Sequence, residues 1–119
     1  MPSRWERPRQ LIDLVDGRWT LAVLGELHDG GHRYQELHDA LDGISYKVLT
    51  ETLRRSERDG LIARHLDAER IEMATLYQLT ELARSLDAPL TAMTEWAAHN
   101  SQLVEAARTR WDRLRRASS

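Results

Sequence analysis

The sequence contains no cysteine. A chain without thiols forms no disulfide bonds, holds no zinc through thiolates and senses no oxidant through a reactive cysteine. It also lacks an apolar run of membrane-spanning length and a signal-peptide core at its amino terminus. We therefore expect a soluble, cytoplasmic protein that has no membrane partner.

Sequence motifs of catalysis are missing as well. There is no glycine-rich phosphate loop, no nucleophile elbow and no acid pair set in an apolar pocket motif. His28, His32 and His38 surround one loop, but they lack carboxylates at the spacing that metal ligands need. We expect no catalytic residues, no cofactor and no metal site.

What is present suits one globular domain over residues 1–119, because 41% of the 119 residues are hydrophobic. The net charge of −2 and the isoelectric point near 6.2 argue against a non-specific nucleic-acid binder. The basic charge is nevertheless local. Cations outnumber acids between Ser45 and Arg58, and arginines crowd the last segment: Arg108, Arg110, Arg113, Arg115 and Arg116.

The segment between Gly43 and Leu61 has clear start and stop signals for one short helix. Gly43 makes a turn, Ser45 can cap the helix that follows, and Gly60 can end it. Helical spacing separates an apolar side (Val48, Leu49, Thr52, Leu53) from a polar side (Tyr46, Lys47, Thr50, Glu51, Arg54, Arg55). Spacing alone supports equally a solvated surface helix and a helix that meets bases and phosphates in a major groove.

The preceding residues predict three short helices. Residues 1–9 suit an arm, and a first helix begins near Pro8 and ends before Gly17. A nearly all-apolar helix from Trp19 to Leu27 should form the centre of the core. After extended residues at 32–33, a third helix runs from Tyr34 to Leu41, and a tight turn then leads to Ser45, which is the geometry of a helix-turn-helix.

The following residues predict a wing and two more helices. Residues 61–66 and 74–79 read as strands of a hairpin joined by a charged loop, 67–73. Thr80 should cap a long helix that bends at Pro89. The last amphipathic segment, 101–116, has little core left to cover, so we expect it to pack on a second subunit in a homodimer; the alternative is that it folds back on the first helix.

These elements define a mainly α fold with a small β-hairpin: a winged helix-turn-helix with N- and C-terminal dimerisation helices. Several motifs resemble the HxlR-type winged helix-turn-helix transcriptional regulators, which are close to the MarR group in architecture. The similarity covers residues 8–99 and leaves 100–119 as a C-terminal helix. It rests on Gly17-Arg-Trp-Thr20, Arg33-Tyr34-x-Glu36-Leu37, Gly43-Ile-Ser45-x-Lys47-x-Leu49-Thr50, Asp59-Gly-Leu-Ile62, Tyr77-x-Leu79-Thr80 and Trp96.

The resemblance implies a dimeric regulator whose paired recognition helices enter successive major grooves of a pseudo-palindromic operator, about 34 Å apart. It places the start of the recognition helix at Ser45. Cationic and hydroxyl side chains would then meet phosphates or guanine edges, namely Ser45, Lys47, Arg54 and Arg55. Base selectivity would fall to Tyr46, Thr50 and Glu51.

The sequence departs from the family at two places. Many members carry a sensing cysteine before an N-terminal proline, whereas this chain has Glu6-Arg7-Pro8 there, so thiol sensing is excluded. The wing loop is acidic, and its DNA contact would rest on Arg70, helped by Arg64 or His65. This acidic loop and Glu51 keep open an alternative function, a winged-helix protein–protein interaction module that does not bind DNA.

The tryptophans divide between core and periphery. Trp19 should be buried in the core. Trp5, Trp96 and Trp111 should lie at a dimer interface or line an aromatic cavity for a flat effector. The sequence therefore predicts a homodimeric repressor of a nearby operon, bound to double-stranded DNA and released by a non-covalent small-molecule effector.

Overall fold

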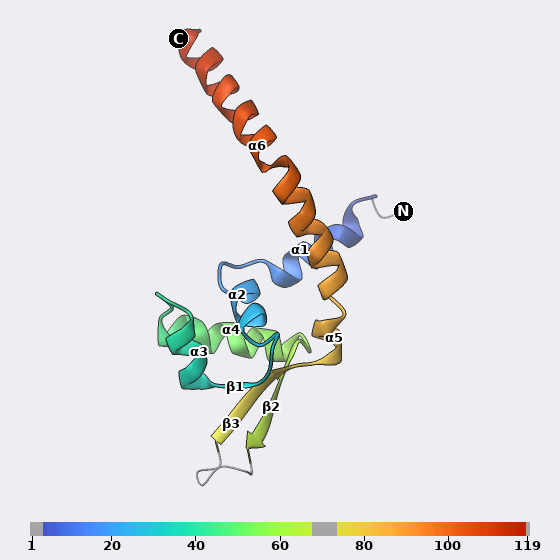
Figure 1. Ribbon diagram of the computed structural model, residues 1–119, viewed down its shortest axis with the longest axis vertical. Helices are drawn as coiled ribbons and strands as arrows, with labels where there is room; N and C mark the ends of the chain where they lie inside the picture. The colour runs from blue at the N-terminus through green and yellow to red at the C-terminus, as the bar shows by residue number, and fades with distance from the viewer. Residues whose placement is uncertain (1–3, 68–73, 119) are drawn as a thin grey trace. The chain divides into compact units, whose positions relative to one another are not determined.

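A computed structural model describes residues 4–67 and 74–118 of the chain. The chain divides into two compact units, residues 1–85 and residues 86–119, and each is described by itself. The first unit contains the predicted helix-turn-helix and wing (Figure 1). Its elements are α1 (Glu6–Val15), α2 (Thr20–Glu26), β1 (His32–Arg33), α3 (Tyr34–Ala40), α4 (Tyr46–Arg58), β2 (Ile62–Asp67), β3 (Ala74–Leu79) and α5 (Glu81–Arg84).

The three strands form one antiparallel sheet in the order β1-β3-β2. The predicted hairpin is present, with Ile62 opposite Leu79 and Arg64 opposite Tyr77. Residues 32–33 were expected only to be extended, but they pair with β3 on its other side. A Cβ atom on Gly31 would lie 2.9 Å from side-chain atoms of β3, so glycine allows this close approach.

Both ends of α4 follow the sequence prediction. At the start, the Ser45 hydroxyl accepts a hydrogen bond from the Val48 amide at 3.1 Å. At the end, Gly60 has a φ of +78°, its amide donates to Glu57, and the Leu61 amide donates to Ser56. This pair of bonds is a Schellman motif, and it satisfies the last carbonyls of the helix.

The core of the first unit lies where α2, α3 and α4 meet the sheet. Leu27, Leu37, Leu49 and Leu61 are almost fully buried. Trp19 differs from the expectation, since it is only half-buried and the Arg18 guanidinium lies 5.1 Å from the centre of its ring. The smaller aliphatic side chains of α2, rather than its tryptophan, occupy the centre.

The prediction of a bent helix from Thr80 followed by a separate helix at 101–116 is wrong. Thr80 does cap a helix, but α5 ends at Arg84, and one continuous helix, α6, runs from Asp87 to Ala117. Pro89 falls in the first turn of α6, where a backbone N–H has no helical partner, so it need not interrupt the hydrogen bonding.

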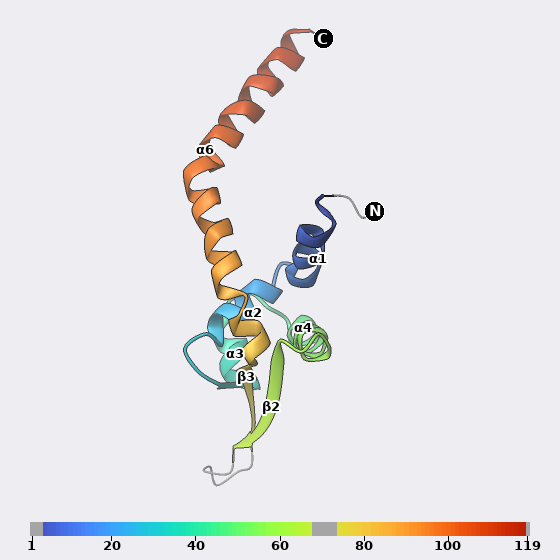
Figure 2. The same ribbon diagram turned by 90° about the vertical axis from the view of Figure 1, so that its right-hand side faces the viewer.

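Helix α6 shows gentle curvature in its middle (Figure 2). There the side chains of Thr94, Asn100 and Ser101 hydrogen-bond to carbonyls one turn earlier, an arrangement that often bends helices. None of the described residues of α6 is buried within its own unit. In the part of the chain that the structure describes, no helix is both long and apolar enough to cross a membrane.

Replacing the serine that caps α4 and a serine buried within α4 by alanine should have opposite effects on stability. The Ser56 hydroxyl is buried and has no hydrogen-bond partner among the described residues, whereas the Ser45 hydroxyl caps α4. We expect Ser56→Ala to raise the free energy of unfolding by about 1 kcal/mol, because it removes an unsatisfied polar group. We expect Ser45→Ala to lower it by about 1 kcal/mol. Urea denaturation at fixed protein concentration measures both, and equal losses would contradict the assignment.

Candidate nucleic-acid interface

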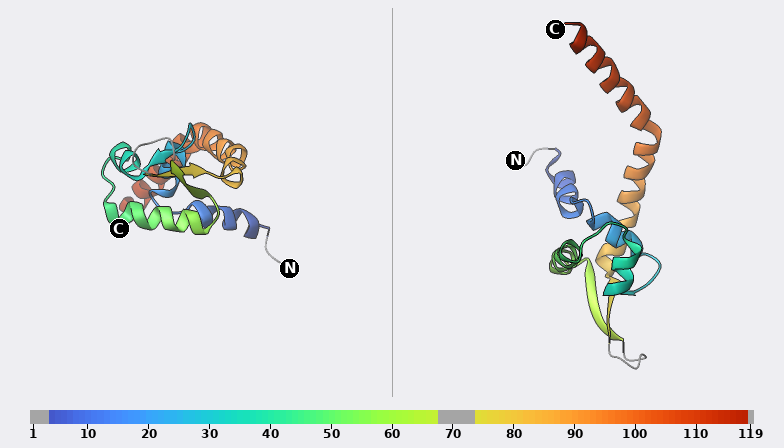
Figure 3. Two further views of the ribbon diagram at one scale, coloured as in Figure 1. Left: turned by 90° about the horizontal axis from the view of Figure 1, so that it is seen from below. Right: turned by 90° about the vertical axis from the view of Figure 1, so that its left-hand side faces the viewer.

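Helices α3 and α4 form the helix-turn-helix. The turn between them is held inward by Leu41 and Ile44, which are both buried, and Gly43 adopts a φ of +87°. The hairpin of β2 and β3 lies beside α4 (Figure 3). This is the arrangement in which a second helix can enter a groove while a wing follows the DNA backbone.

One face of α4 is fixed against the core. Leu49, Thr52, Leu53 and Ser56 are all buried. Because an α-helix repeats every 3.6 residues, the opposite face must point outward. The exposed side chains on that outer face are Lys47, Glu51, Arg54 and Arg58.

Tyr46 and Thr50, both predicted to select bases, also contact α3. The Tyr34 hydroxyl donates to the Tyr46 carbonyl at 2.9 Å and lies 2.8 Å from the Thr50 hydroxyl. Since a phenol has one proton, Thr50 must donate in that second bond. The Tyr46 ring stacks on His38 with ring centres 3.8 Å apart. Both side chains therefore brace α4 against α3.

Arg55 and Ser45 also have roles within the protein. An Arg55 Nη2 atom donates to the Thr20 hydroxyl at 3.4 Å, which directs the guanidinium toward α2. The Ser45 hydroxyl is the cap of α4. Arg70, the predicted wing contact, lies outside the described residues. The structure thus brings Lys47, Glu51 and Arg54 together on the outer face. The other described candidates have contacts within the protein, although Ser45, Tyr46 and Arg55 remain exposed.

A cleft lies between α4 and the hairpin, and we call it the α4–wing cleft. Its volume is about 160 Å³, and the Arg64 Nε atom donates to the Glu57 carboxylate at 2.9 Å on its wall. Burial raises the pKa of the Tyr77 hydroxyl above its usual 10.0, and the nearby Arg64 guanidinium opposes this shift. The residues that line the cleft are Tyr34, Thr50, Leu53, Arg54, Glu57, Arg64 and Tyr77.

Sequence reasoning assigned no site role to Tyr34 or Glu57. Tyr34 stood in a family motif, but its bonds to α4 join residues that are 12 and 16 positions away. Glu57 and Arg64 are seven positions apart and lie on either side of the Asp59-Gly60 turn. A chain reversal between an acid and a cation was the signal that could have indicated their pairing.

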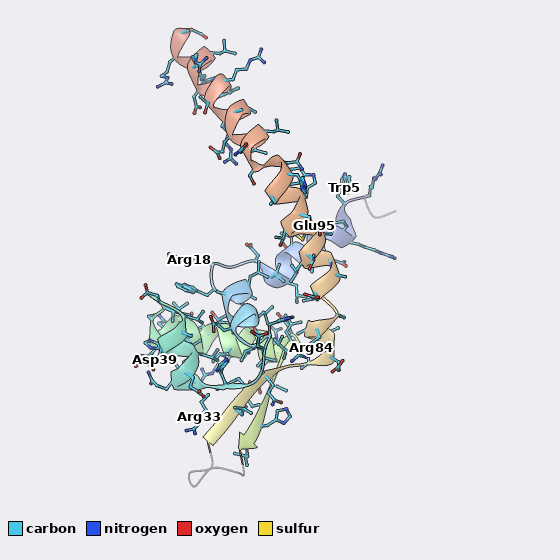
Figure 4. All side chains as sticks on the ribbon, viewed as in Figure 1. Trp5, Arg18, Arg33, Asp39, Arg84 and Glu95 are labelled. Carbon is cyan, nitrogen blue, oxygen red and sulfur yellow. The ribbon has the colours of Figure 1, made fainter. Side chains whose placement is uncertain are left out.

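The three peripheral tryptophans are exposed. Trp5 projects from the start of α1 and is 66% exposed (Figure 4). Trp96 and Trp111 are 62% and 59% exposed on α6. At 1.5 Å per residue these two rings are roughly 22 Å apart along the helix axis, farther than one small effector spans.

Across residues 4–67 and 74–118, no cluster of three or more potential metal ligands is present.

The fold and the outer face of α4 define the class of protein: a winged helix-turn-helix transcriptional regulator. The family model described as HxlR-like helix-turn-helix matches residues 14–105. The chain belongs to the HxlR family of transcriptional regulators, as the motifs indicated, and the members it matches are regulators rather than enzymes.

Individual relatives agree with this assignment. The chain is 37% identical over 97 residues to the uncharacterized HTH-type transcriptional regulator sll1512 of Synechocystis sp., covering 78% of this chain and 71% of that protein. It is 31% identical over 106 residues to the uncharacterized regulator YdeP of Bacillus subtilis, covering 87% and 82%.

Solved structures agree as well. A structure described as a MarR-family transcriptional regulator from Enterococcus faecalis superposes with a TM-score of 0.77 at 30% identity, covering 91% of this chain and 96% of that one. The redox regulator HypR in its reduced form gives a TM-score of 0.73 at 27% identity, covering 85% and 99%. The winged helix-turn-helix prediction is confirmed.

The raised pKa of Tyr77 predicts a loss of stability at alkaline pH. Well below pH 10 the hydroxyl is protonated in folded and unfolded chains, so it has no effect on their balance. As the pH approaches and passes 10.0, the unfolded chain releases the proton first, and the free energy of unfolding falls. We expect Tyr77→Phe to make this fall above about pH 9 shallower. Tyr46→Phe is the matched control, and an equal change in both variants would contradict the prediction.

Proposed function

We propose that the protein is a cytoplasmic, homodimeric repressor that binds a pseudo-palindromic operator of a nearby operon through α4. The outer face of α4 is the observation that carries this proposal. It presents Lys47, Glu51 and Arg54 from a helix whose other face is fixed in the core. A rigid helix with exposed cations and one acceptor suits insertion into a major groove.

The side chains on this face can divide the work of recognition. Lys47 and Arg54 can bind phosphates or the O6 and N7 atoms of guanine, and the Glu51 carboxylate can accept from a cytosine amino group. Ser45 and Arg55 lie at the margins of the face, where each would have to leave its partner in the protein to reach a phosphate. Tyr46 and Thr50 would act by holding α4 at a fixed angle.

Helix α6 supports the dimer. Apolar side chains recur on it at heptad-like spacing, and they are exposed within their own unit. Such a stripe is buried when a second copy packs against it. The exposed members are Met93, Trp96, Leu103, Val104, Trp111 and Leu114.

An effector would act without covalent chemistry. HypR is named a redox regulator, but this chain has no cysteine and must respond in another way. Because Trp96 and Trp111 are far apart on one helix, one small effector would contact only one of these two rings in a given subunit. A true effector must change both tryptophan fluorescence and operator affinity, since coupling between sites is reciprocal.

The alternative function is a protein-interaction module that uses the same face, and the exposed Glu51 carboxylate favours it. A mobility-shift titration against the DNA upstream of the chain's own gene, at two salt concentrations, separates the two functions. We expect a shift that weakens steeply as salt rises, because phosphate neutralisation releases counterions. The absence of any shift at low salt would support the interaction module instead.

The outer face predicts which cations matter most. We expect Lys47→Ala and Arg54→Ala each to weaken operator binding by about tenfold or more, because every dimer loses two contacts. Arg18→Ala is the matched control, because it removes a cation from the same unit but from outside α4. If all three variants weaken binding equally, the contact face is not the outer face of α4.

If the apolar stripe on α6 forms the dimer interface, one charged side chain in the stripe should dissociate the dimer. We expect Trp111→Glu to raise the dimer dissociation constant by about 100-fold or more, because it would bury carboxylates in an apolar interface. Gln102→Glu adds the same charge on the opposite face of α6 and should leave the dimer intact. Sedimentation equilibrium measures both, and a dimer that is unchanged by Trp111→Glu would contradict this interface.

A further inference from the structure

The α4–wing cleft combines the chemical groups that recognise a phosphate. Among the described residues that line it, Arg54 and Arg64 supply guanidinium groups, and Tyr77 supplies a hydroxyl. The Tyr34 and Thr50 hydroxyls also line it, but their protons are used in bonds within the protein. Guanidinium groups match phosphate oxygens through paired N–H bonds. A volume of about 160 Å³ gives one phosphate group room to enter.

A second hollow extends the cleft along the hairpin. It has a volume of about 280 Å³ and is lined by Glu57, Arg64, His65, Leu66 and Thr75. Glu57 and Arg64 belong to both hollows, so their ion pair lies where the two meet. A strand of nucleic acid backbone that follows α4 toward the wing would pass this pair.

The ion pair places an acid where a phosphate would bind. The Arg64 side chain is 56% exposed and the Glu57 side chain 34% exposed, so solvent and ligands reach both. Their 2.9 Å bond occupies the Nε–H donor of Arg64, and the negative charge of Glu57 beside the guanidinium would repel a phosphate. The carboxylate and a phosphate therefore compete for one guanidinium.

We propose that the α4–wing cleft binds one phosphate group, and that Glu57 is an internal competitor that holds Arg64 until this phosphate displaces it. The DNA backbone beside the groove read by α4 is the favoured source, and this part rests on the proposed function. By neutralising Arg64, Glu57 lowers affinity for all DNA. Occupancy then falls most on unrelated sequences, which lack the base contacts of α4 to offset the loss.

The test is a double-mutant cycle on the full-length protein. On an unrelated duplex, we expect Glu57→Gln to tighten binding about five- to tenfold at low salt. The slope of the logarithm of the binding constant against the logarithm of the salt concentration should steepen by about 0.9 per protomer, the value for one added phosphate contact. Arg64→Gln should weaken binding. In the presence of Arg64→Gln, the change Glu57→Gln should no longer tighten binding.

Glu81→Gln is the matched control. It removes the same charge from an exposed position of the same unit, on α5, which neither lines the cleft nor belongs to the outer face of α4. Its effect should add to that of Arg64→Gln, because it acts only through the overall charge. If Glu57→Gln is equally additive, DNA backbone does not compete for Arg64. Urea denaturation of each variant confirms folding, since an exposed ion pair contributes little to stability.

A second arm uses inorganic phosphate and follows the Arg64 Nε–H resonance by NMR. The first outcome is a saturable shift of this resonance by phosphate that is larger in Glu57→Gln, while the effects of Glu57→Gln and Arg64→Gln on DNA binding are additive. It would assign the cleft to a small phosphorylated ligand. Coupling on DNA with weak phosphate binding would assign it to the backbone. If no duplex binds, the proposed function fails while this arm still tests the cleft. The proposal is overturned if neither phosphate nor DNA shifts the Arg64 Nε–H resonance and the effects of Glu57→Gln and Arg64→Gln on DNA binding are additive.

Discussion

Burial of one face of α4 is the constraint on which the rest of this structure depends. Leu49 and Leu53 are almost fully inaccessible, the Ser45 cap fixes the first turn, and the Schellman motif at Gly60 fixes the last. A helix that is anchored along one side and closed at both ends has no freedom to rotate. The direction of Lys47 and Arg54 is therefore set by apolar packing on the far side of the helix.

The polar residues of α4 serve two purposes that composition alone does not separate. Some brace the helix: Thr50 bonds to Tyr34, and Arg55 reaches the Thr20 hydroxyl. Others remain free to meet a ligand on the outer face. Under the proposed function, this division reduces the number of side chains that are available to read bases. A chain with a net charge of −2 can still present a basic surface, because the cations on the outer face of α4 are local.

Local signals in the sequence predicted most of the fold. Ser45 and Gly60 bounded α4, and alternating residues predicted both strands of the wing. Two features that the sequence did not predict share a physical cause, because each depends on contacts between distant residues. Pairing of β1 with β3 and bonding of Tyr34 to Thr50 leave no periodic pattern. The break before α6 has a local cause instead: Pro89 lies in a first turn, where it is tolerated, and not in a helix interior.

The central claim is that α4 enters the major groove, and dimethyl sulfate footprinting on the DNA upstream of the chain's own gene tests it most directly. This reagent methylates guanine N7 in the major groove and adenine N3 in the minor groove. The account predicts protection of guanine N7 in two clusters about one helical turn apart, at the spacing of paired recognition helices. Protection confined to adenine N3, or no protection under conditions where the protein shifts the same DNA, would contradict it.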